Sequence, residues 1–273
     1  MSQGYGVTNA ATGLAAANFT WSSGYTTGRA RLNDGIMDEV AAGASSAQAT
    51  GQTLDIDFGA DVSLVGFALL NHNLASGACT VSVRADVNGA FPGPTTAKAA
   101  STIVTTGPNS KDTVLQFPVQ TFRYWRLTFA HAGTKIIRLG ELLAFTAITT
   151  LSRGSIYGDG DGERAVLNKN VSDTGHQRAT FLAGPIRTKR LIYKDLSTSQ
   201  LAEIRSMWAA TFYGASNLLF IPSIESTATA ATEAAQECLW GKLQPEFDFT
   251  RPDLNLYDPS NFAIVGQGRE VGA

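Results

Sequence analysis

Apolar and polar residues alternate along several short segments in the first half of the chain. Alternation with a period of two is typical of a β-strand that buries one face. The positions that share a face in these segments are Leu54, Ile56 and Phe58; Cys79, Val81, Val83 and Ala85; Trp125, Leu127 and Phe129; and Ile137, Leu139, Glu141, Leu143 and Phe145. Because the neighbours of Trp125 on its face are apolar, we expect its indole to lie in the core rather than to form a stacking platform.

Turn signals separate these predicted strands. Gly59 ends the first strand and is followed by the apolar run Val62–Leu70. Asn88–Gly89 tolerates the positive φ of a tight turn, and Pro92–Pro94 marks an irregular loop. No segment before residue 147 has a convincing helical period. Many short strands separated by glycine-rich turns predict a β-sandwich over residues 1–147.

The character of the chain changes after residue 147. The segment Ala147–Gly162 is rich in Thr, Ser and Gly and is interpreted as a domain boundary. The strands expected beyond it are Lys189–Tyr193, Leu218–Ile221, Cys238–Leu243 and Asn261–Val265. Ser226–Ala235, rich in Ala and Thr, is low in complexity and is expected to form a loop or a short helix.

One amphipathic helix is predicted after the first of these later strands. Ser197 and Gln200 have the S-x-x-Q spacing of a capping box, which satisfies two otherwise unpaired amides. The residues on one face of the helix, at spacings of three and four, are Leu201, Ile204, Met207, Trp208, Thr211 and Phe212. Gly214 lies where a C-terminal cap needs positive φ. Residues 148–273 are therefore predicted to form a small α+β domain, in a chain that is mainly β.

The composition fits two domains with ample cores. Of the 273 residues, 44% are hydrophobic and only 16% are charged, against about 25% in an average domain. Such a sparsely charged surface is expected where much of it contacts other subunits. The net charge of −2 and the pI of about 5.9 indicate no nucleic-acid partner, although Arg187, Lys189, Arg190 and Lys194 form a basic stretch.

Cysteine usage and apolar runs indicate neither a zinc site nor a membrane span. Cys79 and Cys238 lie far apart in apolar, strand-like runs, where a free cysteine is usually a small buried hydrophobe. The start of the chain lacks the basic region and long apolar core of a signal peptide. No run approaches the ~20 apolar residues of a membrane helix. We expect synthesis in the cytoplasm.

Catalytic signatures are missing from the sequence. His72, His131 and His176 have no neighbour at metal-ligand spacing, and no G-x-S-x-G, H-E-x-x-H or P-loop pattern occurs. We therefore expect no enzymatic activity and no cofactor. His72 lies between Asn71 and Asn73 after an apolar strand. These three residues form either a ligand loop at the sandwich rim or a turn whose side chains satisfy its own backbone.

A second candidate site lies in the boundary segment. Asp159, Asp161 and Glu163 alternate with glycines across Gly158–Gly162. Calcium prefers several carboxylate oxygens on a tight glycine turn, so these three residues are candidate calcium ligands. They lack the remaining acidic positions and the distal Glu of an EF-hand loop. A linker or a hairpin tip is the competing interpretation, and we expect no metal.

Four segments, in order, resemble the discoidin or galactose-binding-like β-sandwich family. They are Leu32-Asn-Asp-Gly35, Leu54-Asp-Ile-Asp-Phe-Gly59, Arg123-Tyr-Trp-Arg-Leu127 and Leu139-Gly-Glu-Leu-Leu143. They are similar to that family's early Asp-Gly loop, its I-D-L-G strand and turn, its R-Y-V-R-I strand and its terminal E-L-x-V strand. The resemblance covers roughly residues 11–145 and implies a jelly-roll sandwich. The chain lacks the tryptophan after the Asp-Gly loop and the cysteine pair of many members, so the resemblance leaves any ligand open.

The second half resembles the distal tail and other minor tail proteins of long-tailed bacteriophages. The matching segments are Lys189–Tyr193, Ser197–Gly214, Leu218–Pro222, Trp240–Leu243 and Phe262–Glu270. The resemblance implies a homo-oligomeric ring in the virion tail, with six copies by analogy, that joins the tail tube to the receptor-binding apparatus. Its partners would be tube, hub, tape-measure and fibre proteins.

Three functions compete on this sequence. The first is the structural ring subunit of a phage tail tip, which the sparse charge and both resemblances favour. The second is a carbohydrate-binding module of a surface or receptor-binding protein, which a cluster of exposed aromatic and polar residues at one sandwich rim would favour. The third is an enzyme such as a hydrolase, which a concave pocket with a perturbed acid or base would favour.

Overall fold

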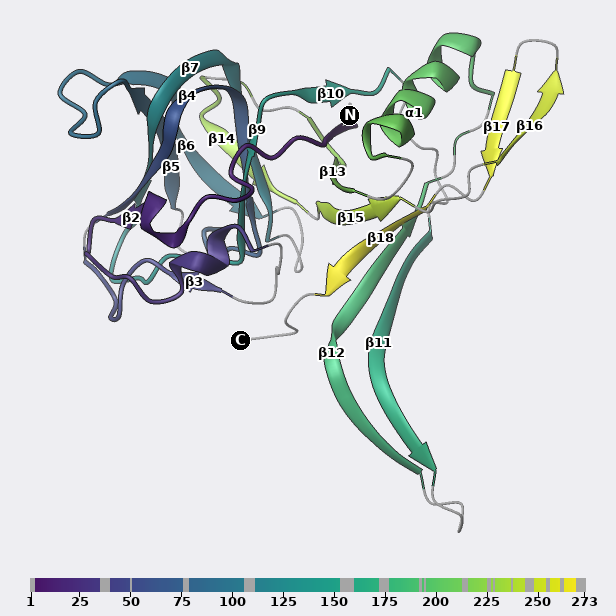
Figure 1. The fold of residues 1–273 in the computed structure, drawn as a ribbon, viewed down its shortest axis with the longest axis horizontal. Helices are drawn as coiled ribbons and strands as arrows, with labels where there is room; N and C mark the ends of the chain where they lie inside the picture. The colour runs from purple at the N-terminus through teal and green to yellow at the C-terminus, as the bar shows by residue number, and fades with distance from the viewer. Residues whose placement is uncertain are drawn as a thin grey trace. The chain divides into compact units, whose positions relative to one another are not determined.

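A computed structural model of the chain describes residues 3–34, 40–49, 51–75, 79–105, 111–152, 160–171, 177–191, 193, 195–212, 216–224, 227, 229–236, 238–243, 248–253, 256–260 and 263–268. The fold is mainly β with one α-helix in this part of the chain, as the sequence predicts (Figure 1). It divides into two compact units. The sandwich unit comprises Met1–Thr150 and Phe220–Cys238, and the hairpin unit comprises Leu151–Leu219 and Leu239–Ala273.

The main sheet of the sandwich unit has the strand order β14-β6-β5-β7-β4-β2, and β9 pairs with β4. The bounds of these strands are β2 Phe19–Trp21, β4 Gln52–Leu70, β5 Thr80–Asp86, β6 Thr95–Thr105, β7 Thr113–Ala130, β9 Glu141–Phe145 and β14 Thr232–Ala235. Three-residue strands β1 (Gly4–Gly6) and β10 (Ile148–Thr150) pair with each other, as do β3 (Ala41–Ala42) and β8 (Arg138–Leu139). Two short 3-10 helices, Ala16–Asn18 and Arg29–Leu32, precede β3.

β4 and β7 are long strands that pair with each other on both sides of a bend. Their register shifts between Asp57 and Val62, where Gly59 has a φ of 78°, a left-handed conformation that glycine adopts readily. Before the shift β4 pairs with β2 on its other side, and after it with β9. The shift therefore bends both strands (Figure 1), so that the predicted turn at Gly59 is a bend within one long strand.

The core of the sandwich unit contains the predicted alternating residues of the first three strands. In the fourth the alternation shifts between β8 and β9, so that Leu142 and Ala144 lie in this core and Leu143 and Phe145 are buried outside it. Trp125 is fully buried, with ring centroids 5.6 Å from those of both Phe67 and Phe117. Its Nε1 donates to the carbonyl of Phe122 at 3.0 Å, so the indole is a satisfied core side chain and the stacking-platform interpretation is set aside. Phe58 is only partly buried, because it lies next to the bend.

The hairpin unit contains the antiparallel strand order β15-β18-β12-β11. Its elements are β11 Gly160–Val171, β12 Gln177–Arg190, α1 Thr198–Ala210, β13 Asn217–Ile221, β15 Leu239–Leu243, β16 Asp248–Asp253, β17 Leu256–Ser260 and β18 Ala263–Gly268; the last two residues of β13 are counted with the sandwich unit. Of the strand expected at Lys189–Tyr193, only Lys189 and Arg190 belong to β12, which begins much earlier and ends at Arg190. The sequence analysis did not predict β11.

The capping box of α1 is present as predicted. The backbone amide of Gln200 donates to Ser197 Oγ at 3.3 Å, and that of Ser197 donates to Gln200 Oε1 at 3.0 Å. Leu201, Ile204 and Met207 are buried. The prediction for Phe212 is wrong: the helix ends at Ala210, and Phe212 has a φ of 50° with a side chain 72% exposed. Gly214 lies outside the described residues.

The Phe220–Cys238 segment belongs to the sandwich unit, whereas the sequence places it in the second domain. We refer to Phe220–Cys238 as the strap. Within it, β14 adds a parallel strand to β6 at the edge of the sandwich sheet. The expected loop or short helix at Ser226–Ala235 therefore includes a strand, because the neighbouring edge of β6 offers it backbone partners. No helix in the described part of the chain is long and apolar enough to cross a membrane.

Candidate functional site

Two arginine–aspartate pairs cross the exposed face of the sandwich sheet between β4 and β7. Arg126 donates from Nε and Nη2 to the two carboxylate oxygens of Asp55, both at 2.6 Å. Arg123 donates in the same two-point manner to Asp57 at 2.7 and 2.9 Å. Two-point arginine–carboxylate contacts are the strongest and most directional of the side-chain ion pairs. They fix the register of the two longest strands.

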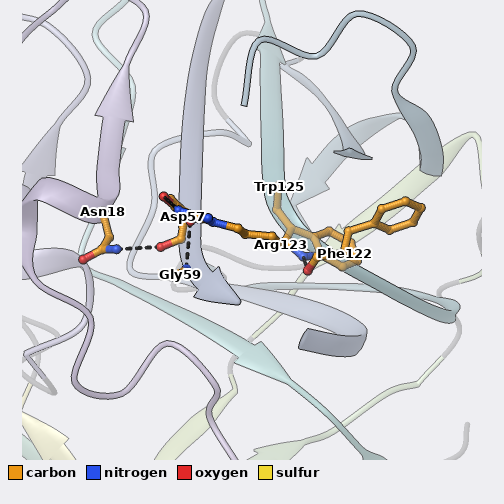
Figure 2. A network of polar contacts seen from close by, with 6 residues as sticks. All are labelled: Asn18, Asp57, Gly59, Phe122, Arg123 and Trp125. Carbon is orange, nitrogen blue, oxygen red and sulfur yellow. Dashed lines mark hydrogen bonds and ion pairs between the residues drawn. The ribbon is translucent and has the colours of Figure 1, made fainter. Parts of the chain in front are cut away.

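Asp57 is held from three sides (Figure 2). Besides Arg123, the amide of Gly59 donates to its Oδ1 at 2.8 Å, and Asn18 Nδ2 donates to its carbonyl at 2.7 Å. The hydrogen bonds from Arg123 lower the pKa of the Asp57 carboxyl, and partial burial offsets only part of that effect. The carboxylate therefore stays charged and ties the start of the bend to β7.

Arg126 lies between a carboxylate and an aromatic ring. Its guanidinium carbon is 4.1 Å from the ring centroid of Phe91, close enough for a cation–π contact. The hydrogen bonds from Arg126 to Asp55 raise the pKa of the guanidinium. Phe91 has a φ of 52°, which is uncommon for a bulky residue, and its amide donates to the carbonyl of Asn88 at 2.9 Å. The Asn88 turn thus fixes the ring against Arg126.

These pairs explain why two of the family-like segments occur together. The aspartates of Leu54–Gly59 and the arginines of Arg123–Leu127 point to the exposed face, while Leu54, Ile56 and Trp125 alternate into the core. Next to Arg126 on β5, the register places Arg84, which is exposed. We refer to Arg84, Asp55, Arg126 and Phe91 as the arginine face. Arg84 is exposed and the Asp55 and Arg126 side chains are each 29% exposed, whereas the Phe91 ring against Arg126 is buried.

The Asn71–Asn73 loop directs its polar groups into the protein. Asn71 and His72 are buried, at 8% and 3% exposure. His72 Nδ1 accepts from the amide of Leu74 at 3.2 Å, so its Nε2 carries the proton towards Thr113 Oγ1 at 2.8 Å. Asn73 Nδ2 donates to the carbonyl of Ile136 at 2.8 Å. The loop satisfies backbone and side chains of the sandwich, which is the second of the two interpretations that the sequence allows.

The structure describes two of the three candidate calcium ligands. Asp159 lies outside the described residues, whereas Asp161 and Glu163 lie in β11, opposite Lys189 and Arg187 of β12. The stretch from Gly160 onward is therefore the open end of a hairpin and not its tip. Within the described residues no cluster of His, Cys, Asp and Glu suits a metal ion.

No sequence motif predicts two features of the structure. One is the long hairpin β11–β12, whose antiparallel pairs run from Gly160 opposite Arg190 to Val171 opposite Gln177. The other is a buried ion pair of 2.5 Å between Lys98 Nζ and Glu233 Oε1, with 0% and 5% of the side chains exposed. Lys98 lies in β6, a strand of mostly small residues that the sequence analysis did not predict. A lysine in a run of Ala, Ser and Thr is the one signal that the sequence offers.

No family model matches the chain, and no curated protein matches it. Solved structures that are similar to it include a pectin-binding carbohydrate-binding module, with 15% identity over 50% of this chain and 91% of that one and a TM-score of 0.36. A chitosan-binding module from the chitosanase/glucanase of Paenibacillus sp. IK-5 has 21% identity over 50% and 98%, with a TM-score of 0.35. CpGH89CBM32-5 from Clostridium perfringens, in complex with GalNAc-β-1,3-galactose, has 13% identity over 48% and 96%, with a TM-score of 0.37.

All three are carbohydrate-binding β-sandwich domains, and each is similar to about half of this chain. At such identities and TM-scores the likeness carries no argument about a ligand. None of the three is a phage tail protein, so the comparisons lend no support to the resemblance of the second half to tail proteins.

Proposed function

We propose that the chain is a structural subunit that assembles with other protein chains through the β11–β12 hairpin. The carrying observation is that, among the strands that the structure describes, the distal half of this hairpin has only its own two (Figure 1). β12 pairs with β18 through Ile186–Arg190. From Gln177 to Ala183 it pairs with β11 alone among the described strands.

A two-stranded ribbon is a marginal structure in water. Strand pairs need a third strand or a packed face for independent stability. Both outer edges of the ribbon present backbone amides and carbonyls that can pair with another chain. A protein that keeps twelve residues in β11 and fourteen in β12 gains stability when a neighbouring subunit covers them.

The assembly that we propose is a ring at the tip of a bacteriophage tail. This step rests on the resemblance of the second half to distal tail proteins and on the sparse charge of the chain, 16% of residues. A ring needs two different surfaces on each subunit, one for each neighbour. A projecting hairpin that docks on the next subunit supplies one of them, and its interface should bury well over about 1,000 Å².

Truncating the hairpin tests this function. In the variant, Val166–Ala183 is replaced by an Asn-Gly turn, which keeps the pair of Arg164 with Ile186 and suits a tight hairpin. We expect the full chain to form oligomers by mass photometry. The variant should dissociate at concentrations at which the full chain stays assembled, with an unchanged thermal midpoint of the sandwich unit. A full chain that is monomeric at every concentration, or a truncated chain that assembles equally well, contradicts the proposal.

Glycan binding is a second candidate function, favoured by the arginine face. Arg84 is exposed beside the fixed guanidinium of Arg126, and side chains of this kind can bind the oxygens of a sugar. A glycan array probed with the full chain tests it, with Arg84→Gln as the variant. Arg138→Gln is the matched control, because Arg138 is also an exposed arginine of the same unit. Equal binding by both variants would exclude the arginine face, and no binding by the full chain would exclude the function.

A further inference from the structure

The strap fills one edge of the sandwich sheet with a strand that comes from far along the chain. Thr232–Ala235 of β14 pairs in parallel with Thr102–Thr105 of β6. Parallel neighbours are usually joined by a single crossover of a dozen or more residues. Here the connection runs through the rest of the sandwich unit and much of the hairpin unit. Chain connectivity therefore does little to determine which strand lies beside β6.

Specific polar chemistry holds the strap in place. Lys98 is fully buried, pairs with Glu233 and also donates to the carbonyl of Thr227. Ser101 Oγ donates to the carbonyl of Ala230. At the far end of the strap, the backbones of Asp112 and Gln236 exchange two hydrogen bonds of 3.0 and 2.7 Å. The edge of β6 thus recognises a strand that carries a carboxylate at the position of Glu233.

This acceptor edge requires an occupant. Where a strand covers β6, Lys98 is buried, and its charged amine has lost its water and needs the carboxylate. The strand β6 would also present an open row of backbone groups, which pairs readily with other strands. Any chain that offers the same segment meets both needs equally well.

We propose that in the assembly the strap of one copy docks on β6 of a neighbouring copy. The inference rests on the proposed assembly function and names a second contact of the same assembly. Both ends of the strap continue into the hairpin unit, at Leu219 and Leu239, so the strap is tethered to that unit and not to the sandwich that it completes. The contacts made in exchange are the same as those within one copy, which makes exchange of an element a low-cost route to an oligomer.

Cysteine pairs placed across β6 and β14 distinguish exchange from docking within one copy. Val104 and Ala234 are register partners, and both are exposed, so Val104→Cys/Ala234→Cys in the full chain should form a disulfide on oxidation. The control pair is Ser82→Cys/Thr128→Cys, which are partners on β5 and β7. Both members of that pair lie within the first 130 residues, so their disulfide stays within one copy. The natural Cys79 and Cys238 are buried and free, and the unmodified chain controls for them.

Both pairs are oxidised at concentrations where mass photometry shows oligomers and are then run on a non-reducing gel. Exchange predicts covalent multimers for Val104→Cys/Ala234→Cys and monomers for the control pair. Monomers from both pairs while the protein is oligomeric would overturn the exchange and leave the assembly function standing. A first pair that forms no disulfide while the control pair does would also overturn it. A protein that is monomeric throughout would overturn the assembly function and the exchange together.

Discussion

Lys98→Met should destabilise the sandwich unit far more than the loss of an exposed cation. The lysine side chain is 0% exposed and its amine lies 2.5 Å from Glu233 Oε1. Methionine fills a similar volume without the charge, so the variant leaves the carboxylate of Glu233 buried and without its cation. Breaking a buried pair by removing one partner costs about 3–5 kcal/mol. We expect a loss of that size in the free energy of unfolding.

Two further variants separate the charge from the packing. In Arg123→Met the broken pair with Asp57 is 40% and 33% exposed, and water replaces the lost partner, so the expected cost is under about 1 kcal/mol. In Lys98→Met/Glu233→Leu no charge remains buried at this site. Apolar replacement of a whole buried pair is often neutral or stabilising, so the double variant should recover most of the loss.

Urea unfolding followed by tryptophan fluorescence measures these differences. The comparison is valid where the dependence of the unfolding free energy on urea is the same for all variants, because an equal slope indicates an equal change in exposed surface. A cost for Lys98→Met no larger than that of Arg123→Met would refute the reasoning, since it would show that the amine is hydrated. A double variant as unstable as the single one would show that packing and not charge holds the strap.

Three smaller predictions follow from the same structure. Trp125→Ala should lower the unfolding free energy by about 3–5 kcal/mol, whereas Val119→Ala, 61% exposed on the same strand, should change it by less than about 0.5 kcal/mol; urea unfolding measures both. Ser197→Ala should weaken α1 by about 1 kcal/mol through the lost cap, seen as faster amide exchange at Gln200. Because Arg123 lowers the pKa of Asp57, the stability from this pair is present above the unfolded pKa of about 4 and is lost as pH falls through the folded value. The stability difference between the full chain and Arg123→Met should therefore shrink in acid, and a constant difference would contradict it.

Local patterns predicted the parts of the fold that neighbouring residues determine. The capping box at Ser197 and Gln200 depends on three-residue spacing, and the burial of Trp125 depends on alternation along its own strand. Both appear in the structure. The end of the helix was predicted less well, because the apolar Phe212 continues the helical pattern in sequence while its backbone has already turned to a φ of 50°.

The features that escaped prediction are two strand pairings, one between distant segments of the chain and one within a hairpin. Glu233 lies in an Ala- and Thr-rich stretch that carries no strand pattern of its own, and it becomes part of a strand because β6 supplies partners. The hairpin β11–β12 is held by backbone pairs along Gly160–Val171, where glycines and charges hide the alternation. The partner of β14 lies far along the chain, whereas the hairpin strands are neighbours in sequence but are held by backbone pairs, which leave little trace in residue type.

The residues that carry the family resemblance have structural reasons to be there. Asp55 and Asp57 recur with Arg123 and Arg126 because two-point ion pairs set the register of β4 on β7. The structure of the sandwich alone accounts for these four residues, so their presence does not indicate a ligand. The groups through which we propose that this chain binds its neighbours, the edges of the hairpin and of β6, are mainly backbone amides and carbonyls, joined at β6 by the ion pair of Lys98 with Glu233. A sequence can therefore resemble a sugar-binding fold while an assembly function depends on strand edges that no motif marks.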